Sequence, residues 1–320
     1  MCDTCGGHGD GSSHSLRHSQ PDHHAHDHTQ DHPHDHHAHE HHVHEHGGGK
    51  RVVVVGKGGV GKSTLCALMA RTLAREGRRV VAVDADEQRN LAATLGLGLT
   101  ESVSIVPVAE NADYVEEKTG ARPGEGAGGM LVLNPDTSDL VDRLSVEAPD
   151  GVRLVVMGGV RGAGAGCLCP ETALISSAVA GMRLRGDDVV VMDTHAGVEH
   201  FGRALARGFD SVLVVVEPTF NAVQVGMESA ALAGALGIGE VHLVVNRTRS
   251  DGDVDRVMDY VEQLGGPPFS SVTSVPYDAA ALLSEPSVDA LLDRPAVVGV
   301  VGALSARVAG ALNPSLAGVG

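Results

Sequence analysis

The sequence predicts an α/β domain with a doubly wound, mostly parallel sheet. Short runs rich in Val recur along the chain, and helical stretches such as residues 62–77 lie between them. The runs are continuously apolar, as in strands that helices cover on both faces, and the alternation of strand and helix is typical of a parallel sheet. The six clearest runs are 51–56, 79–84, 153–158, 188–193, 212–217 and 241–246. Residues 97–150 are rich in Gly and Pro and indicate no clear element.

Composition limits the classes of function. The 320 residues are 42% hydrophobic but only 2% aromatic, so Val, Leu and Ala must build the core. The formal net charge of −17 argues against nucleic-acid phosphate as a partner. No apolar run is long enough to span a bilayer, and the first residues lack the apolar segment of a secretory signal. We therefore expect a cytoplasmic protein with no membrane partner, whose cysteines stay reduced.

The first 49 residues differ from all that follow. They hold 16 of the 19 histidines, interleaved with Asp and Glu. Because almost nothing in this leader can be buried, we expect it to be disordered without metal. Gly47, Gly48 and Gly49 would form a flexible joint. The predicted organisation is a Cys/His-rich leader, 1–49, and one folded domain, 50–320.

A phosphate-binding loop follows the first predicted strand. The stretch "GKGGVGKST" satisfies Gly-x-x-x-x-Gly-Lys-Ser/Thr. Its glycines let backbone N–H groups approach phosphates, and the following helix adds positive potential at its N-terminus. Lys62 would reach the β- and γ-phosphates, and Ser63 would bind Mg²⁺. A Gly-rich turn is the structural alternative. The expected nucleotide-binding residues here are Gly56, Gly58, Gly59, Val60, Gly61, Lys62, Ser63 and Thr64.

Lys57, one residue after the first glycine, makes the loop resemble the deviant P-loop of the family that includes MinD, ParA and the nitrogenase iron protein. The resemblance implies the P-loop NTPase fold of that type. In this family the signature lysine crosses a dimer interface to the nucleotide of the partner. The resemblance therefore implies an ATPase that works as an ATP-sandwiched homodimer, with Lys57 in a catalytic role.

Two further stretches resemble the switch segments of the same family. In "VDADEQRNL" the resemblance makes Asp86 the residue that orients the attacking water. In "VVMDTHAGVEHFGR" it makes Asp193 the Walker B carboxylate, which would support Mg²⁺ together with Ser63. Asp84 could also support Mg²⁺. Strand termination with helix capping is the alternative for Asp84 and Asp193.

The sequence favours adenine over guanine. GTP-binding P-loop proteins usually carry Asn-Lys-x-Asp, whereas here Asn246 is followed by Arg247 and no aspartate two residues later. Together with "VPYD", which contains Pro276, this resembles the adenine pocket of MinD-like proteins. We expect ATP as the nucleotide.

Two cysteines one residue apart, Cys167 and Cys169, lie among glycines and before Pro170. In an extended segment residues i and i+2 point to one side, so the two thiols would face the same direction. Two thiols fill half of a four-coordinate site, and a second copy of the chain would complete it. Thiolates suit Zn²⁺ or Ni²⁺. The alternative is two small core residues, which we expect for Cys66.

The deviant P-loop, "GCLCPE" and "DTHAGVEH" together resemble the CooC-type ATPases, which mature nickel carbon monoxide dehydrogenase. The resemblance covers residues 51–278. The Cys-x-x-Cys of the iron–sulfur carrier branch is absent near the C-terminus. The C-terminal stretch has one Arg and predicts a packing helix, unlike the basic membrane helix of positioning relatives.

The leader instead resembles the N-terminus of HypB, the nickel GTPase of hydrogenase maturation. Cys2 and Cys5, with the α-amino group or His8, could bind metal tightly, and the tract His23–His46 would add weaker imidazole sites. A solvated tail or an expression tag is the alternative. The two resemblances favour nickel over zinc as cargo.

These patterns together predict an ATP-hydrolysing nickel chaperone with carbon monoxide dehydrogenase as its client. The alternatives are a nickel storage and sensing protein, a hydrogenase-type maturation factor, and a partitioning ATPase, which the acidic charge disfavours.

Overall fold

The computed structural model describes residues 48–123, 131–158, 169–196 and 208–310. Within these residues eight strands form one sheet, in the order β3-β4-β2-β5-β1-β6-β7-β8. All neighbouring strands are parallel except β3, which is antiparallel to β4. The predicted doubly wound, mostly parallel α/β fold is confirmed. The strands are β1 (Lys50–Gly56), β2 (Val80–Ala85), β3 (Val146–Glu147), β4 (Arg153–Val156), β5 (Val189–Thr194), β6 (Ser211–Val216), β7 (Glu240–Thr248) and β8 (Ser271–Pro276).

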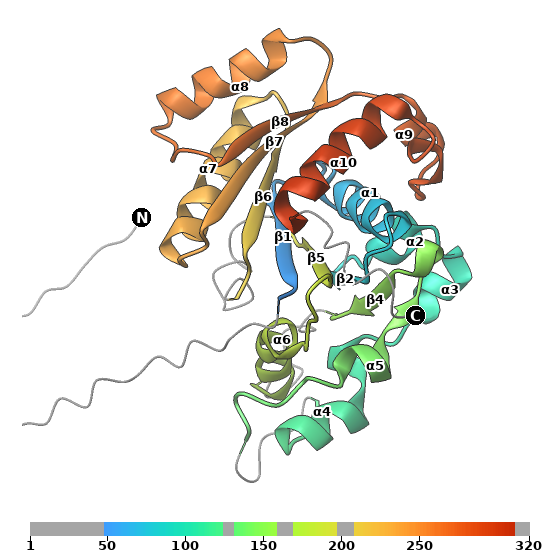
Figure 1. Ribbon diagram of the computed structural model, residues 1–320. Helices are drawn as coiled ribbons and strands as arrows, with labels where there is room; N and C mark the ends of the chain where they lie inside the picture. Colours follow the sequence, from blue (N-terminus) through green and yellow to red (C-terminus); the bar gives the residue numbers. More distant parts are fainter. Residues whose placement is uncertain (1–47, 124–130, 159–168, 197–207, 311–320) are drawn as a thin grey trace, which may run out of the picture. The chain divides into compact units, whose positions relative to one another are not determined.

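Helices cover both faces of the sheet. α1 and α10 lie on one face, and α7 and α8 lie on the other (Figure 1). The α-helices are α1 (Lys62–Arg75), α2 (Leu91–Leu95), α3 (Leu99–Ser104), α4 (Ala112–Thr119), α5 (Leu140–Leu144), α6 (Cys169–Gly181), α7 (Phe220–Ala235), α8 (Gly252–Gln263), α9 (Ala280–Leu283) and α10 (Pro295–Ala309). Short 3₁₀ turns are η1 (Val108–Glu110), η2 (Pro149–Gly151) and η4 (Asp289–Leu291).

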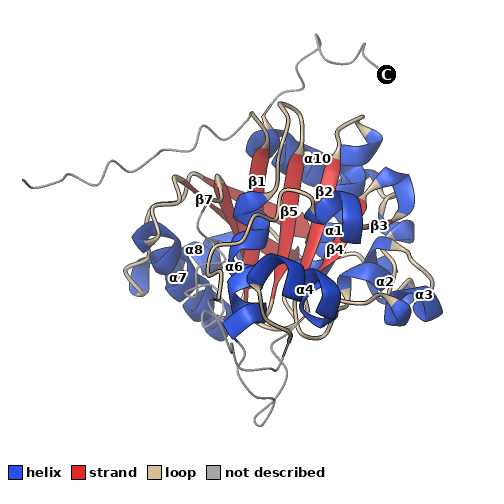
Figure 2. Cartoon of the chain, turned by 90° about the horizontal axis from the view of Figure 1, so that it is seen from below, coloured by secondary structure: helices blue, strands red, loops and turns tan. Residues whose placement is uncertain are grey.

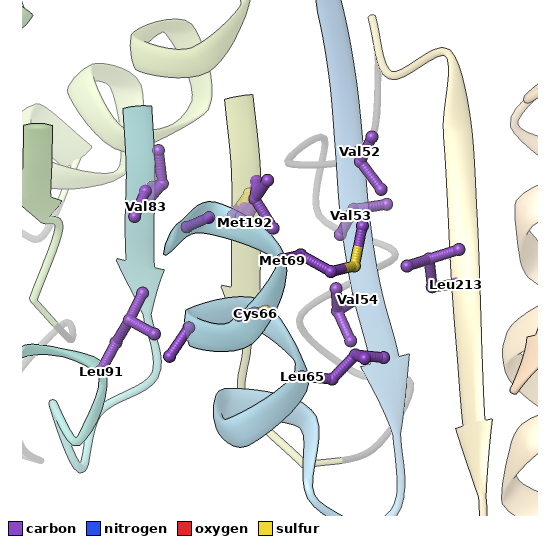
Figure 3. Packing of buried hydrophobic residues seen from close by; sticks show 14 of the residues in the cluster. Val52, Val53, Val54, Leu65, Cys66, Met69, Val83, Leu91, Met192 and Leu213 are labelled. Atoms are coloured by element: carbon purple, nitrogen blue, oxygen red, sulfur yellow. The ribbon is translucent and has the colours of Figure 1, made fainter. Parts of the chain in front are cut away.

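The core is built from Val, Leu, Ala and Met, as the composition predicts. In β1, residues 52–55 are all Val and all buried, because β-branched side chains suit a pleated strand that is covered on both faces. Leu65, Cys66 and Met69 of α1 pack on the face of the sheet shown in Figure 3, near Leu213 of β6. Burial of each such Leu or Met stabilises the fold by about 1.5–3 kcal/mol.

On the opposite face of the sheet, α7 packs very closely against β6. A Cβ atom at Gly226 would lie 2.6 Å from Val216 Cγ1 and 3.1 Å from Val214 Cγ1. Glycine at this position therefore allows the helix to lie directly on β6.

The region 97–150, which the sequence left unassigned, contains α3, α4, α5 and two of the 3₁₀ turns. α6 packs against α4 and against η1, and Figure 2 shows α4 and α6 beside each other. This packing places α6 beside η1 and α4, which follow β2 in the chain.

The predicted packing helix at the C-terminus is confirmed as α10. It begins at Pro295, a residue suited to the first helical turn, and it packs against α1. Arg78, which follows α1, donates to the carbonyl of Ala309 at 3.2 Å. Among the described helices, none combines the length and apolar character that a membrane span requires.

The sheet register brings two aspartates together. Asp84 of β2 and Asp193 of β5 are direct partners, and Asp193 also pairs with Val54 of β1. All three strands are parallel, so their carboxyl ends open at one edge of the sheet. A doubly wound sheet binds ligands at this edge.

Candidate nucleotide site

The loop between β1 and α1 has the backbone conformation of a phosphate cradle. Gly56, Gly59 and Gly61 have φ values of 144°, 82° and 94°, a region that residues with a side chain rarely adopt. α1 begins without a side-chain cap hydrogen bond. Its first backbone N–H groups therefore remain available to an anion, which the helix dipole also favours.

Two of these glycines also permit close contacts. A Cβ atom at Gly56 would lie 2.3 Å from the carbonyl oxygen of Val215, and one at Gly61 would lie 2.4 Å from Asn246 Nδ2. Asn246 Nδ2 donates to the carbonyl of Val60 at 2.7 Å. The end of β7 thus holds the loop in place.

The two lysines of the phosphate loop differ in their exposure to solvent. Lys62 is buried, and its Nζ donates to the carbonyl of Lys57 at 3.2 Å. Burial lowers the pKa of Lys62, and the carboxylates of Asp193 and Asp86 partly offset this effect. Lys57 is exposed, so its side chain is accessible to another molecule.

Asp193 has the character of a cation ligand. Its side chain is fully buried, and within the part of the chain that the structure describes neither carboxylate oxygen has a hydrogen bond of good geometry. Burial raises the pKa of Asp193 to about 6, although the nearby Ser63 hydroxyl and Lys62 act in the opposite direction. A buried carboxylate with unused oxygens, beside a hydroxyl, fits Mg²⁺.

Asp84 has a structural role. Its Oδ1 accepts from the backbone N–H of Asp86 at 3.1 Å, and its Oδ2 accepts from that of Leu91, at the start of α2, at 3.0 Å. Both oxygens are therefore used, which favours the capping interpretation over magnesium binding. Burial and the adjacent Asp193 raise the pKa of Asp84 to about 7.

Asp86 lies just beyond the end of β2, and its Oδ1 accepts from the backbone N–H of Gln88 at 2.9 Å. The same oxygen lies 3.9 Å from Nδ1 of His195. The sequence reasoning did not single out His195. The only feature of the sequence that could have indicated a role for His195 is its position two residues after Asp193.

A cavity of about 430 Å³ adjoins the loop. Residues that the sequence assigned to base binding, Asn246, Arg247 and Pro276, line it together with Gly61 and Thr64 of the loop. The fold therefore brings the expected phosphate and base residues around one space.

The cavity wall also contains residues that the sequence reasoning missed. One of them, Glu217, pairs with Arg247, whose φ is 58°. The guanidinium carbon of Arg249 lies 4.3 Å from the centre of the Tyr277 ring, a cation–π contact. These side chains add charged groups and an aromatic ring to the cavity wall.

The structure describes the predicted cysteine residues to different extents. Cys66 is fully buried, and burial raises the pKa of its thiol well above the usual value, so it is a core residue as expected. Cys167 lies outside the described residues, as do Cys2, Cys5, His8 and His23–His46. Cys169 begins α6, but its side chain is not described. No group of three or more potential metal-binding side chains occurs in the described ranges.

Comparison with known proteins agrees with this geometry. The family described as the CobQ/CobB/MinD/ParA nucleotide binding domain matches residues 52–285, most of the chain. The chain belongs to this MinD/ParA-like family. It is therefore an ATPase, and the family implies ATP and Mg²⁺ as its nucleotide and cation.

Within the MinD/ParA-like family the chain is of the CooC type. It is 35% identical over 230 residues to the carbon monoxide dehydrogenase accessory protein CooC of Rhodospirillum rubrum, covering 72% of this chain and 84% of that protein. It is also 35% identical over 236 residues to an uncharacterized ATP-binding protein of Methanocaldococcus jannaschii, covering 73% and 88%.

Solved structures agree with the MinD/ParA-like fold. The MinD cell division protein of Aquifex aeolicus superposes with a TM-score of 0.56 at 22% identity, covering 83% of this chain and 98% of that one. The septum site-determining protein MinD of Pyrococcus horikoshii, in complex with Mg-ADP, gives 0.58 at 17% identity, covering 84% and 97%.

Proposed function

We propose that this CooC-type ATPase is a cytoplasmic nickel chaperone that delivers Ni²⁺ to a client metalloenzyme, carbon monoxide dehydrogenase. The observation that carries the proposal is the 35% identity to a carbon monoxide dehydrogenase accessory protein over most of both chains. The Cys-x-Cys pair, Cys167 and Cys169, supports a thiophilic cargo.

The nucleotide part of the proposal assigns a role to each side chain. Backbone N–H groups of residues 58–64 and the Lys62 ammonium bind the phosphates of ATP. The Ser63 hydroxyl and the oxygens of Asp193 would hold Mg²⁺, which would supply positive charge against the phosphate oxygens. Asp86 accepts a hydrogen bond from the attacking water and orients it toward the γ-phosphorus.

The dimer part of the proposal rests on two incomplete sites. Lys57 is exposed, as suits a lysine that contacts the nucleotide of a partner chain. Each chain offers two adjacent thiols, which is half of a four-thiolate site. ATP would close the homodimer and complete both sites, and hydrolysis would open it and release nickel.

The leader would supply the cargo. Its Cys2, Cys5 and His8, and the tract His23–His46, offer thiolate and imidazole ligands outside the folded domain. We propose that the leader captures Ni²⁺ and passes it to Cys167 and Cys169. Zn²⁺ would compete for the same thiolates. The acidic charge supports a role without nucleic acid or membrane.

Nickel transfer tests the proposal against its main alternative, a nickel storage and sensing protein. The nickel-loaded protein is mixed with nickel-free carbon monoxide dehydrogenase, and the activity gained by the enzyme is followed with ATP, ADP or no nucleotide. The proposal predicts transfer that needs ATP hydrolysis and is lost in Asp86→Ala. Equal transfer under all three conditions would support storage. Activation of a nickel-free hydrogenase in place of carbon monoxide dehydrogenase would support the hydrogenase-type alternative.

A further inference from the structure

We propose that His195 positions Asp86 for ATP hydrolysis, by donating a hydrogen bond from Nδ1 to Oδ1 of the Asp86 carboxylate. This inference rests on the proposed role of Asp86 in orienting the attacking water. It gives His195, the first residue after β5, a role beside that of Asp193 within the strand.

The strand end places His195 inside the nucleotide site. Thr194, the last residue of β5, is turned away and donates its hydroxyl to the carbonyl of Val54 at 2.7 Å. Residues i and i+2 of an extended segment share a side, so the side chains of Asp193 and His195 project in the same direction. The next residue, Ala196, lies against the phosphate loop, since a Cβ atom at Gly58 would be 3.3 Å from its Cβ.

The distance between His195 and Asp86 is slightly too long for a hydrogen bond, but a small movement would form one. His195 Nδ1 lies 3.9 Å from Asp86 Oδ1, which is roughly 1 Å longer than a hydrogen bond to a carboxylate. Hydrogen bonds of catalytic groups are often long without substrate and tighten when it binds. The side chains are 28% and 14% exposed, and Nδ1 itself is hidden from solvent. Nδ1 is therefore shielded from water and lies near the Asp86 carboxylate.

A hydrogen bond from His195 would hold the Asp86 carboxylate in one orientation and leave one of its two oxygens free to accept from water. Oδ1 of Asp86 already accepts from the N–H of Gln88 at 2.9 Å, and a second donor at the same oxygen would stop rotation of the carboxylate. Oδ2 would then remain as the acceptor for the attacking water. Positioning of this kind raises the rate of the chemical step without changing contacts to bound ATP.

A purely structural role is the alternative, in which the imidazole only fills space beside the phosphate loop. The two roles differ in which ring nitrogen matters. Asn can place its amide N–H where Nδ1 lies, whereas Gln places its N–H nearer to the position of Nε2. His195→Asn and His195→Gln are therefore a matched pair that is similar in polarity and differs in the atom replaced.

The experiment measures steady-state ATPase rates of the full chain with His195→Ala, His195→Asn and His195→Gln. We expect kcat to fall about 10- to 100-fold in the Ala and Gln variants, and to stay within about threefold of wild type in the Asn variant. KM for ATP should change less than about twofold in all three. Wild-type kcat in His195→Ala, equal loss in Asn and Gln, or a change confined to KM would overturn the proposal.

A double-variant comparison keeps the test independent of folding. If His195 acts through Asp86, His195→Ala should cause no further loss of kcat when added to Asp86→Asn. A full additional loss would contradict the proposal. Its failure is distinguishable from failure of the proposed function, because nickel transfer by the wild type does not depend on the outcome for these variants.

Discussion

Asp84 and Asp193 are direct partners on the neighbouring parallel strands β2 and β5, and both carboxyl groups are buried. The pKa of Asp84 is raised to about 7 and that of Asp193 to about 6, in both cases mainly by burial. Asp84 uses its oxygens in backbone hydrogen bonds, whereas those of Asp193 remain available. Burial of these carboxyl groups therefore destabilises the fold, and a cation bound at Asp193 would relieve part of this effect.

Asp193→Asn should stabilise the nucleotide-free protein while removing its activity. The folded-state pKa of Asp193 lies above its unfolded value, so its favourable contribution is complete below about pH 4 and is lost as pH rises through about 6. The rise of this pKa from 3.8 to about 6 corresponds to about 3 kcal/mol. We expect a gain of about 1–3 kcal/mol in the free energy of unfolding at pH 7.5 that shrinks toward pH 4. Urea unfolding at both pH values measures it.

Asp255→Asn, which neutralises an exposed carboxyl group on α8, is the matched control and should leave the free energy of unfolding nearly unchanged. An Asp193→Asn variant with wild-type stability at both pH values, or one that retains Mg²⁺-dependent ATPase activity, would contradict the assignment.

Lys62→Ala and Asp86→Ala should separate binding from hydrolysis. The buried Lys62 ammonium is expected to contact phosphate in the ground state, so its loss should abolish ATP binding. Asp86→Ala should bind ATP with an affinity within about threefold of wild type but hydrolyse it at least about 100-fold more slowly. Calorimetry and phosphate release measure the two effects. Normal turnover in Asp86→Ala would exclude that residue from the mechanism.

Gly61→Ala should disrupt the loop through contact as well as backbone strain. Its φ is 94°, and the new Cβ would lie 2.4 Å from Asn246 Nδ2, displacing the bond from that amide to the Val60 carbonyl. Gly237→Ala is the control, since φ is 78° there and nothing lies within 4 Å of the new Cβ. We expect a loss of about 1–2 kcal/mol for the control and about 1–3 kcal/mol more for Gly61→Ala. Equal losses in thermal unfolding would show that the contact is unimportant.

Arg89 should connect the nucleotide site to the segment that carries Cys169. It has a φ of 54° and pairs with Glu110 at the end of η1, against which α6 packs. ATP is expected to change the nickel affinity of the wild type, and Glu110→Arg should make this change about 3- to 10-fold smaller. The double variant Arg89→Glu with Glu110→Arg reverses the charges of the pair and should restore part of the change. Nickel titration with and without ATP gives the ratio. Unchanged coupling in Glu110→Arg would show that the pair is only structural.

Most of the sheet could be predicted from the sequence because its central strands are continuous Val-rich runs. The missing strands lack that signal. β3 has only two residues, and β8 lies at the edge of the sheet, where Val275 is buried but Val272 is exposed. The helices between residues 97 and 150 are short and are separated by stretches that contain Gly and Pro, so no helical period can be recognised there.

The phosphate loop was predictable because its spacing is fixed by backbone geometry within nine residues. The place of His195 was not, since its contact with Asp86 depends on β2 and β5 being neighbours, which local sequence does not reveal. The same holds for Arg249 and Tyr277, whose contact joins the segments after β7 and β8.

We propose that nickel and ATP act on one dimer with a shared thiolate site. Sedimentation with metal quantification tests it most directly, on a chain lacking residues 1–46 and on the same chain with Cys167→Ser and Cys169→Ser. We predict a dimer with one Ni²⁺ per two chains for the first, tighter when ATP is present, because each ligand favours the state that the other requires. The cysteine variant should remain a monomer with nickel and still bind ATP. If that variant binds nickel and dimerises as its parent does, the shared site is wrong.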